Sequence, residues 1–285
     1  MKRTQSARAQ PERIRLLALD IDDTLTGSDG RMSQANLEAV AWAAARGVAA
    51  TLVTGRRYLN SAQRFAAALD LSGPIGCHYG RALVVHPDGE FLAQHHLPPD
   101  ISARAVEIAR RRNLGISLCA DETLYFRERT SPASVVPDEW RALPRTKVVP
   151  DLDDVLVTHG ERVMSLTLSG CTVADLRALF AADVELGRVS IYDQRATGRG
   201  ESLVVMLAGG EDKGTALRQI CSRLGIAPAE VVAMGDSEAD VSLLLAAGYG
   251  IAMPWAADSV RSAADQIAQG SPDNAVAREV YRLLG

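Results

Sequence analysis

Three carboxylates lie within four residues at the end of an apolar run, in the stretch LLALDIDDTLTG (16–27). Asp20 follows the apolar run directly, Asp22 and Asp23 come next, and the hydroxyl of Thr24 follows them. Like charges a few ångströms apart repel strongly in a low-dielectric site unless a cation or a proton relieves them. The run therefore indicates either a metal site or side chains that remain in solvent.

Three further polar residues stand at the end of an expected strand or the start of an expected helix. Thr54 ends the apolar run in LVTGRR, Asp236 ends the one in VVAMGDSEAD, and Lys213 opens a helix in GGEDKGTAL. Ligands of open parallel sheets gather at the carboxyl ends of the strands, and a helix N-terminus carries partial positive charge. We therefore expect Thr54, Asp236 and Lys213 to converge with Asp20 on one edge of a sheet.

The segments around these residues alternate between strand and helix patterns. The N-terminal part reads as strand 14–20, helix 33–47, strand 48–55, helix 58–71, strand 75–80 and a hairpin over 81–94. Ser33 and Gly47 are suitable caps for the first helix. Because the alternation returns near the C-terminus, the sequence predicts an α/β fold with a doubly wound, Rossmann-like parallel sheet and helices on both faces.

The middle of the chain, from about Leu97 to Ala208, has a different pattern. Two helices, 100–113 and 172–182, stand among strands expected at 116–127, 162–170, 188–193 and 202–208, and the Pro-rich stretch 128–154 reads as irregular. We therefore expect three parts: residues 1–96 as the first part of the core, with 1–12 a disordered leader, 97–208 as an inserted α+β domain, and 209–285 as the second part of the core.

Together these segments resemble the four motifs of the haloacid dehalogenase superfamily. The place of the insertion resembles the Cof-type branch, subclass IIB, in which a large C2-type cap follows the third strand. The similarity covers nearly the whole chain, and DIDDTLT and GDSEAD are its most specific parts. It implies a Mg²⁺-dependent phosphatase that acts on a small phosphorylated metabolite, with a sugar phosphate as the leading class.

The resemblance implies catalytic and metal-binding roles for the acidic residues. Asp20 would attack phosphorus to form an aspartyl phosphate, and Asp22 would protonate the leaving oxygen and then take a proton from water. The side chains of Asp20 and Asp236 and the backbone carbonyl at Asp22 would hold Mg²⁺, and Asp240 would face the same site and orient metal-bound water. Asp23 would cap the turn that follows.

The remaining site residues would bind the phosphoryl group and the substrate. The hydroxyl of Thr54 and the adjacent amides of Gly55 and Arg56 would donate to the phosphoryl oxygens, and Lys213 would neutralise charge on the phosphate and on Asp20. Tyr79 is expected among the substrate contacts.

Three positions depart from the Cof-type pattern. Tyr79 stands where an NGA motif would have asparagine, Ala239 replaces the asparagine of GDSxND, and Pro254 and Trp255 follow IAM in place of a Gly-Asn pair. The two aromatic rings could pack the seam between core and cap, or they could make the pocket narrower. In the second case we expect a narrow substrate range and a leaving group bulkier or less hydroxylated than a simple hexose.

Two other functions stay compatible with the sequence. A phosphomutase would pass the same aspartyl phosphate to a second hydroxyl, with a second phosphate held by arginines of the middle section, Arg127, Arg129, Arg195 and Arg199. A phosphate-binding regulatory protein with weak turnover would keep the fold. The departures at the three asparagine positions favour this reading, whereas the presence of Asp20 and Asp22 favours an enzyme.

The composition indicates an ordinary globular protein with a full core, because 47% of the 285 residues are hydrophobic. A net charge of −4 argues against a nucleic-acid binder, and no stretch reaches the roughly 20 apolar residues that span a bilayer. The four cysteines are widely spaced and form no metal-binding pair, which is typical of reduced thiols. We expect a cytoplasmic monomer or homodimer.

Overall fold

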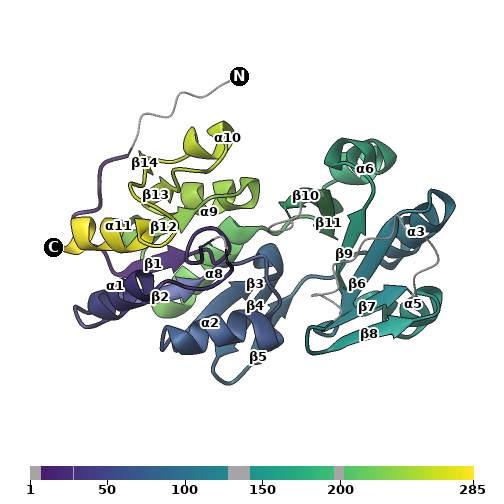
Figure 1. The fold of residues 1–285 in the computed structure, drawn as a ribbon, viewed down its shortest axis with the longest axis horizontal. Helices are drawn as coiled ribbons and strands as arrows, with labels where there is room; N and C mark the ends of the chain where they lie inside the picture. The colour runs from purple at the N-terminus through teal and green to yellow at the C-terminus, as the bar shows by residue number, and fades with distance from the viewer. Residues whose placement is uncertain (1–7, 28, 128–141, 196–201) are drawn as a thin grey trace. The chain divides into compact units, whose positions relative to one another are not determined.

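The computed structural model describes residues 8–27, 29–127, 142–195 and 202–285 (Figure 1). The chain divides into two compact units, one built from the residues up to Ala93 together with Asp212–Gly285, and the other from Gln94–Glu211. The sequence places the borders of the inserted domain at residues 97 and 208, three residues inside those of the second unit. A five-stranded sheet belongs to the first unit and a six-stranded sheet to the second.

The sheet of the first unit has the order β14-β13-β12-β1-β2, and all neighbouring strands are parallel. Its strands are β1 (Leu16–Leu19), β2 (Ala49–Leu52), β12 (Val231–Gly235), β13 (Tyr249–Ala252) and β14 (Gln266–Ile267). The chain adds β2 on one side of β1, whereas β12, β13 and β14 extend the sheet on the other side. The strand order therefore reverses between β1 and β12, which is the place where ligands bind in sheets of this kind.

A smaller antiparallel sheet continues from β2. A single parallel bridge joins Val53 to Gly76 of β3 (Gly73–Cys77), and β3 is followed in the sheet by β4 (Ala82–His86) and β5 (Glu90–Gln94). The turn between β4 and β5 lies at the Pro-Asp-Gly sequence, where Gly89 N–H donates to the carbonyl of Val85. The expected third strand and hairpin are therefore present.

Helices cover both faces of the parallel sheet. Leu16 and Ala18 of β1 pack into a buried cluster with Leu217 of α8 (Lys213–Leu224) and Leu243 of α9 (Val241–Ala246). Successive side chains of a strand point to opposite faces, and the intervening Leu17 is equally buried on the other face. Figure 1 shows α1 and α11 packed on each other beside β2. The doubly wound α/β fold predicted from the sequence is confirmed.

The helices of this unit are α1 (Gln34–Ala44), α2 (Gln63–Ala68), α8 (Lys213–Leu224), α9 (Val241–Ala246), α10 (Asp258–Arg261) and α11 (Ala275–Leu284). Short helical turns accompany them in the described part of this unit: η1 (Tyr58–Ala62), η2 (His78–Gly80), η4 (Pro228–Glu230) and η5 (Glu238–Asp240).

Both caps predicted for the first helix are present in α1. The hydroxyl of Ser33 accepts a hydrogen bond from the backbone N–H of Asn36 at the N-terminus. Past the C-terminus, Gly47 has a φ of +79°, and it donates to the carbonyl of Ala44 while Val48 donates to Ala43. Glycine adopts this left-handed conformation without a Cβ penalty, so the helix ends here.

The second unit has a six-stranded sheet of order β10-β11-β9-β6-β7-β8, antiparallel except for the pair β7 and β8. Ile101 of α3, Val155 of α5 and Leu176 of α6 pack with Leu118 and Leu166 of the sheet in one cluster. Its strands are β6 (Gly115–Ala120), β7 (Thr123–Arg127), β8 (Thr146–Val149), β9 (Val163–Ser169), β10 (Val189–Arg195) and β11 (Ser202–Ala208). Its helices are α3 (Pro99–Arg111), α5 (Asp153–His159), α6 (Val173–Leu179) and α7 (Ala181–Glu185), with the turn η3 (Gly160–Arg162).

The stretch expected to be irregular, 128–154, contains regular structure, so that prediction was wrong for its described part. Thr146–Val149 form β8 and pair with β7, and Asp153 begins α5. A four-residue edge strand with Val148 half exposed has little hydrophobic alternation, which explains why the sequence pattern did not show it. The rest of this prediction, residues 128–141, lies outside the described residues.

The prediction that residues 1–12 form a disordered leader was wrong at Arg8, which lies in the described part of this stretch. Arg8 forms an ion pair with Asp265 in which the guanidinium and the carboxylate are 2.7 Å apart, and the backbone N–H of Arg8 donates to the same carboxylate at 2.7 Å. A tertiary contact across so many residues leaves no local sequence signal. Residues 1–7 lie outside the described residues.

Candidate active site

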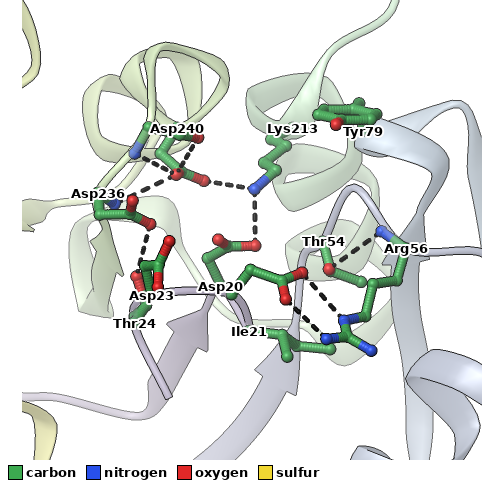
Figure 2. Close-up of polar contacts among 12 residues, drawn as sticks. Asp20, Ile21, Asp23, Thr24, Thr54, Arg56, Tyr79, Lys213, Asp236 and Asp240 are labelled. Carbon is green, nitrogen blue, oxygen red and sulfur yellow. Dashed lines mark hydrogen bonds and ion pairs between the residues drawn. The ribbon is translucent and has the colours of Figure 1, made fainter. Parts of the chain in front are cut away.

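The loops that follow β1 and β12 meet the first turn of α8 at the carboxyl edge of the parallel sheet (Figure 2). Asp20 follows β1, Asp236 follows β12, and Thr54 comes two residues after β2. Lys213 is the first residue of α8 and is only 2% exposed. The structure therefore brings the residues of the four expected motifs to one edge.

A tight turn after β1 orients the acidic residues. The carbonyl of Ile21 accepts hydrogen bonds from the backbone N–H groups of Leu25 and Thr26, at 2.9 and 3.0 Å. Asp23 has a φ of +52°, a left-handed conformation that aspartate tolerates better than most residues. This conformation agrees with the expectation that Asp23 caps the turn that follows.

Lys213 lies between two buried carboxylates. Its ammonium nitrogen is 2.7 Å from Oδ1 of Asp20 and 2.5 Å from Oδ1 of Asp240 (Figure 2). The other oxygen of Asp240 accepts hydrogen bonds from the backbone N–H groups of Asp236 and Ser237 and from the Ser237 hydroxyl, at 3.2, 2.9 and 2.6 Å. Asp240 therefore fixes both the ammonium of Lys213 and the loop that carries Asp236.

The electrostatics of this edge show an excess of negative charge. Burial, with the nearby charge of Asp240 next in importance, raises the pKa of Asp20 to about 7 and that of Asp236 to about 9. Burial alone would lower the pKa of Lys213, but the carboxylates of Asp20 and Asp240 outweigh it and raise that pKa. One ammonium thus faces three carboxylates.

The donor set fits a hard divalent cation. Carboxylate oxygens of Asp20, Asp236 and Asp240 lie within 4.8 Å of one another, and the hydroxyl of Thr24 donates to Oδ1 of Asp236 at 3.2 Å. Oxygen ligands of this kind are those that Mg²⁺ takes, and a cation would relieve the repulsion that raises the two pKa values. Because both oxygens of Asp240 already accept hydrogen bonds, Asp20 and Asp236 are the more available ligands.

Asp22 is held by Arg56 in a bidentate ion pair. Nε and Nη2 of the guanidinium donate to the two carboxylate oxygens at 2.9 and 2.6 Å. The guanidinium carbon also lies 4.7 Å from the centre of the Phe65 ring. The sequence predicts Arg56 as a phosphate contact and does not indicate its pair with Asp22. Opposite charges after β1 and β2, two neighbouring strands, were the only signal for it.

Tyr79 lies over the loop that follows β2. A Cβ atom added at Gly55 would stand 2.6 Å from Cζ of Tyr79, so a larger residue there would require the ring or the loop to shift. The backbone N–H of Tyr79 donates to the carbonyl of Thr54 at 2.9 Å, and Tyr79 has a φ of +56°. Burial raises the pKa of the Tyr79 phenol, and the nearby Lys213 opposes this. The ring thus faces the site and narrows the space above Gly55.

The other positions singled out in the sequence have different surroundings. The indole N–H of Trp255 donates to the backbone carbonyl of Asp23 at 2.7 Å, and Ala239 is buried in η5. Of the arginines expected to hold a second phosphate, Arg127 ends β7 and Arg195 ends β10 in the second unit, whereas Arg129 and Arg199 lie outside the described residues.

A doubly wound core with an inserted α+β unit and a lysine among carboxylates at the strand edge is typical of haloacid dehalogenase-type enzymes. The family model described as haloacid dehalogenase-like hydrolase matches residues 17–280. The chain belongs to this family. The resemblance to its Cof-type branch and the prediction of an enzyme are confirmed.

Two curated proteins illustrate the similarity. The chain is 26% identical over 268 residues to the 5-amino-6-(5-phospho-D-ribitylamino)uracil phosphatase YitU of Bacillus subtilis (strain 168), with 92% of this chain and 95% of that protein covered. It is also 26% identical over 274 residues to the chloroplastic endoribonuclease YBEY of Arabidopsis thaliana. That match covers 92% of this chain but 45% of the plant protein, so the chain spans about half of that relative's length.

Solved structures share the fold. The crystal structure of a haloacid dehalogenase-like hydrolase from Bacteroides thetaiotaomicron superposes with a TM-score of 0.77 at 23% sequence identity, covering 95% of this chain and 100% of that one. In the parts of the chain that the structure describes, no helix is both long and apolar enough to cross a membrane.

Proposed function

We propose that the protein is a Mg²⁺-dependent phosphatase that hydrolyses a small phosphorylated metabolite through an aspartyl phosphate on Asp20. The observation that carries the proposal is the placement of the Asp20 carboxylate, buried at the carboxyl end of β1 and held by Lys213 at 2.7 Å beside Asp236. A nucleophile needs a fixed orientation and a neighbouring positive charge, and this arrangement supplies both.

The reaction would run in two steps. In the first, an oxygen of Asp20 forms a bond to phosphorus while the ester P–O bond breaks, and Asp22 gives a proton to the leaving oxygen. In the second, water attacks the phosphorus, its proton passes to Asp22, and the P–O bond to Asp20 breaks, which releases inorganic phosphate. Both steps use the same two carboxyl groups in turn.

The surrounding residues would stabilise charge on the phosphoryl group. Thr54 and the backbone amides of Gly55 and Arg56 would donate to its oxygens, and Lys213 would neutralise both the phosphate and Asp20. A magnesium ion held by Asp20, Asp236 and the carbonyl at Asp22 would supply further positive charge to the same oxygens. Asp240 would keep Lys213 in place, which follows from its hydrogen bonds.

The guanidinium of Arg56 has two possible partners in this scheme. In the structure it binds the carboxylate of Asp22, and it can turn to a phosphoryl oxygen once that pair opens. Protonation of Asp22, which its role as an acid requires, removes the charge that Arg56 binds and so favours the opening.

The favoured substrate is a sugar phosphate or a related phosphomonoester. The substrate in the name of the YitU relative carries its phosphate on a ribityl chain attached to a uracil. Its leaving group therefore combines hydroxyls with a ring. The ring of Tyr79 over Gly55 supports a leaving group with a flat or apolar surface, because aromatic faces stack on such surfaces. We also propose a cytoplasmic location, on the grounds of the widely spaced cysteines, and a monomer or homodimer.

The test is phosphate release from a panel of phosphorylated metabolites with Mg²⁺, with excess chelator, and with the Asp20→Asn variant. We expect release that needs the metal and that falls by about 10⁴-fold or more in the variant. Comparable release by Asp20→Asn, or indifference to the chelator, would contradict the mechanism. Activation by a sugar bisphosphate would instead favour the phosphomutase reading, and binding without turnover would favour the regulatory one.

A further inference from the structure

The turn that carries Asp22 is held from two sides by residues distant in sequence. Arg56 binds the Asp22 side chain, and the indole N–H of Trp255 donates to the carbonyl of Asp23, the next residue, at 2.7 Å. The Trp255 bond joins positions 232 residues apart. A bond of this kind fixes the backbone of the turn, whereas the Arg56 pair fixes only the side chain.

Trp255 is itself well anchored. Its loop follows β13, where the backbone N–H of Met253 donates to the carbonyl of Gly235 at 2.9 Å and that of Ala256 donates to Met253 at 3.1 Å. The guanidinium of Arg261 donates to the carbonyl of Pro254 at 3.1 Å, and Ala256 is buried. The indole therefore extends from a loop after β13 that is hydrogen-bonded to the end of β12, the strand that also presents Asp236.

Asp20 has separate support. It follows β1 directly, its backbone N–H donates to the carbonyl of Met234, and its side chain is held by Lys213. Asp22 lies beyond Ile21, on the turn that Trp255 contacts, and its side chain is 43% exposed. Loss of the Trp255 bond should therefore disturb Asp22 and leave Asp20 in place.

We propose that Trp255 is a positioning residue for proton transfer by Asp22, acting through the Asp23 carbonyl. The proposal rests on the proposed function, since it assigns Trp255 to the acid step of that reaction. The proton moves from the carboxyl of Asp22 to the leaving oxygen as the ester P–O bond breaks. A turn that is free to move would place this carboxyl in reach of the leaving oxygen for less of the time.

Two substrates with similar rings separate this step from the rest of the reaction. The leaving group of 4-nitrophenyl phosphate departs as a stable phenolate and needs little help from an acid, whereas benzyl phosphate must receive a proton as its bond breaks. The main variant carries 3-benzothienylalanine at position 255, which has the shape of tryptophan but a sulfur in place of the N–H. Trp255→Phe is the second variant, and thermal melting shows that each variant is folded.

The comparison uses kcat/KM, which reports the steps up to departure of the leaving group and not the later hydrolysis, in which Asp22 acts as base for both substrates. We expect kcat/KM for benzyl phosphate to fall about five- to tenfold in both variants, as for the loss of one hydrogen bond, and kcat/KM for 4-nitrophenyl phosphate to fall less than about twofold. The control is Tyr249→Phe on the neighbouring strand β13, which removes the 2.8 Å bond from Tyr249 to Gln266 and should leave the ratio of the two rates unchanged.

Each other outcome has a definite meaning. An equal fall in kcat/KM for both substrates, or no fall for either, would overturn the role of Trp255. A wild-type protein that hydrolyses 4-nitrophenyl phosphate but not benzyl phosphate would also overturn it, because there would be no acid step to position. Failure of the wild-type protein on both substrates would contradict the proposed function itself.

Discussion

Two groups of charged residues at the same sheet edge differ in how deeply they are buried. Lys213, Asp20 and Asp240 form a buried trio in which the side chains are at most 6% exposed, whereas Asp22 and Arg56 form a pair that is 43% and 29% exposed. The trio has little room to move, while the pair can open into solvent. A nucleophile must stay in one place, whereas a general acid must exchange protons. The difference in burial therefore matches the roles proposed for Asp20 as nucleophile and Asp22 as general acid.

The largest expected effect comes from breaking the buried trio. Lys213→Met leaves two buried carboxylates without their cation, and removal of one partner of a buried ion pair costs about 3–5 kcal/mol. We expect a loss of this order in the free energy of unfolding at pH 7.5 without Mg²⁺, together with loss of turnover. Denaturant unfolding measures it, and a loss below about 1 kcal/mol would show that the trio is not the rigid part of the site.

A smaller effect is expected where the loop after β2 meets Tyr79. Gly55→Ala would place a Cβ atom 2.6 Å from the ring, so either the ring or the loop that presents Thr54 must shift. We expect activity to fall about tenfold, and the double variant with Tyr79→Asn to recover most of it. A double variant no better than Gly55→Ala alone would mean that the ring does not cause the loss.

Added Mg²⁺ should stabilise the protein more at high pH than at low pH. The pKa values of Asp20 and Asp236 are raised in the folded state, so these groups favour folding when protonated, and that contribution is lost as pH rises through about 7 and 9. The cation binds the deprotonated forms and competes with protons below those values. The rise in Tm on adding Mg²⁺ should therefore grow from pH 6 to pH 9, and Asp236→Asn should reduce it. An equal rise at both pH values would be inconsistent with a metal on these carboxylates.

The smallest effect belongs to the exposed pair. Arg56→Gln removes a partly solvated partner of Asp22, and pairs of this exposure contribute up to about 1 kcal/mol. We expect the free energy of unfolding to change by no more than this, in contrast to Lys213→Met, while kcat for benzyl phosphate falls. A loss of stability equal to that of Lys213→Met would remove the distinction between the two groups.

The sequence was sufficient for the fold and for the convergence of the candidate site residues on one sheet edge. Apolar runs that end in Asp20 and Asp236, with helices between the strands, predict a parallel sheet, and the carboxyl ends of its strands must share one edge. Local chemistry also predicted the start of α8 at Lys213 and the caps of α1 at Ser33 and Gly47. These features depend on neighbours in the chain.

The partners of the site residues could not be predicted in the same way. The pair of Asp22 with Arg56 joins residues 34 apart, and the bond from Trp255 to Asp23 joins residues 232 apart. The spacing of residues in the sequence does not specify which side chain forms an ion pair with an exposed carboxylate. The weak edge strand β8 and the anchored Arg8 were missed for the same reason, because tertiary contacts and not periodicity hold them.

The most direct test of the account is to find the residue that carries the phosphoryl group. Asp22→Asn should still be phosphorylated by 4-nitrophenyl phosphate, which needs little acid, but should lose its phosphate slowly because no base activates water. Acid quenching within the first turnover, followed by peptide mass spectrometry, should place one phosphoryl group on Asp20. A phosphoryl group on any other residue, or steady phosphate release with none on the protein, would contradict Asp20 as the nucleophile.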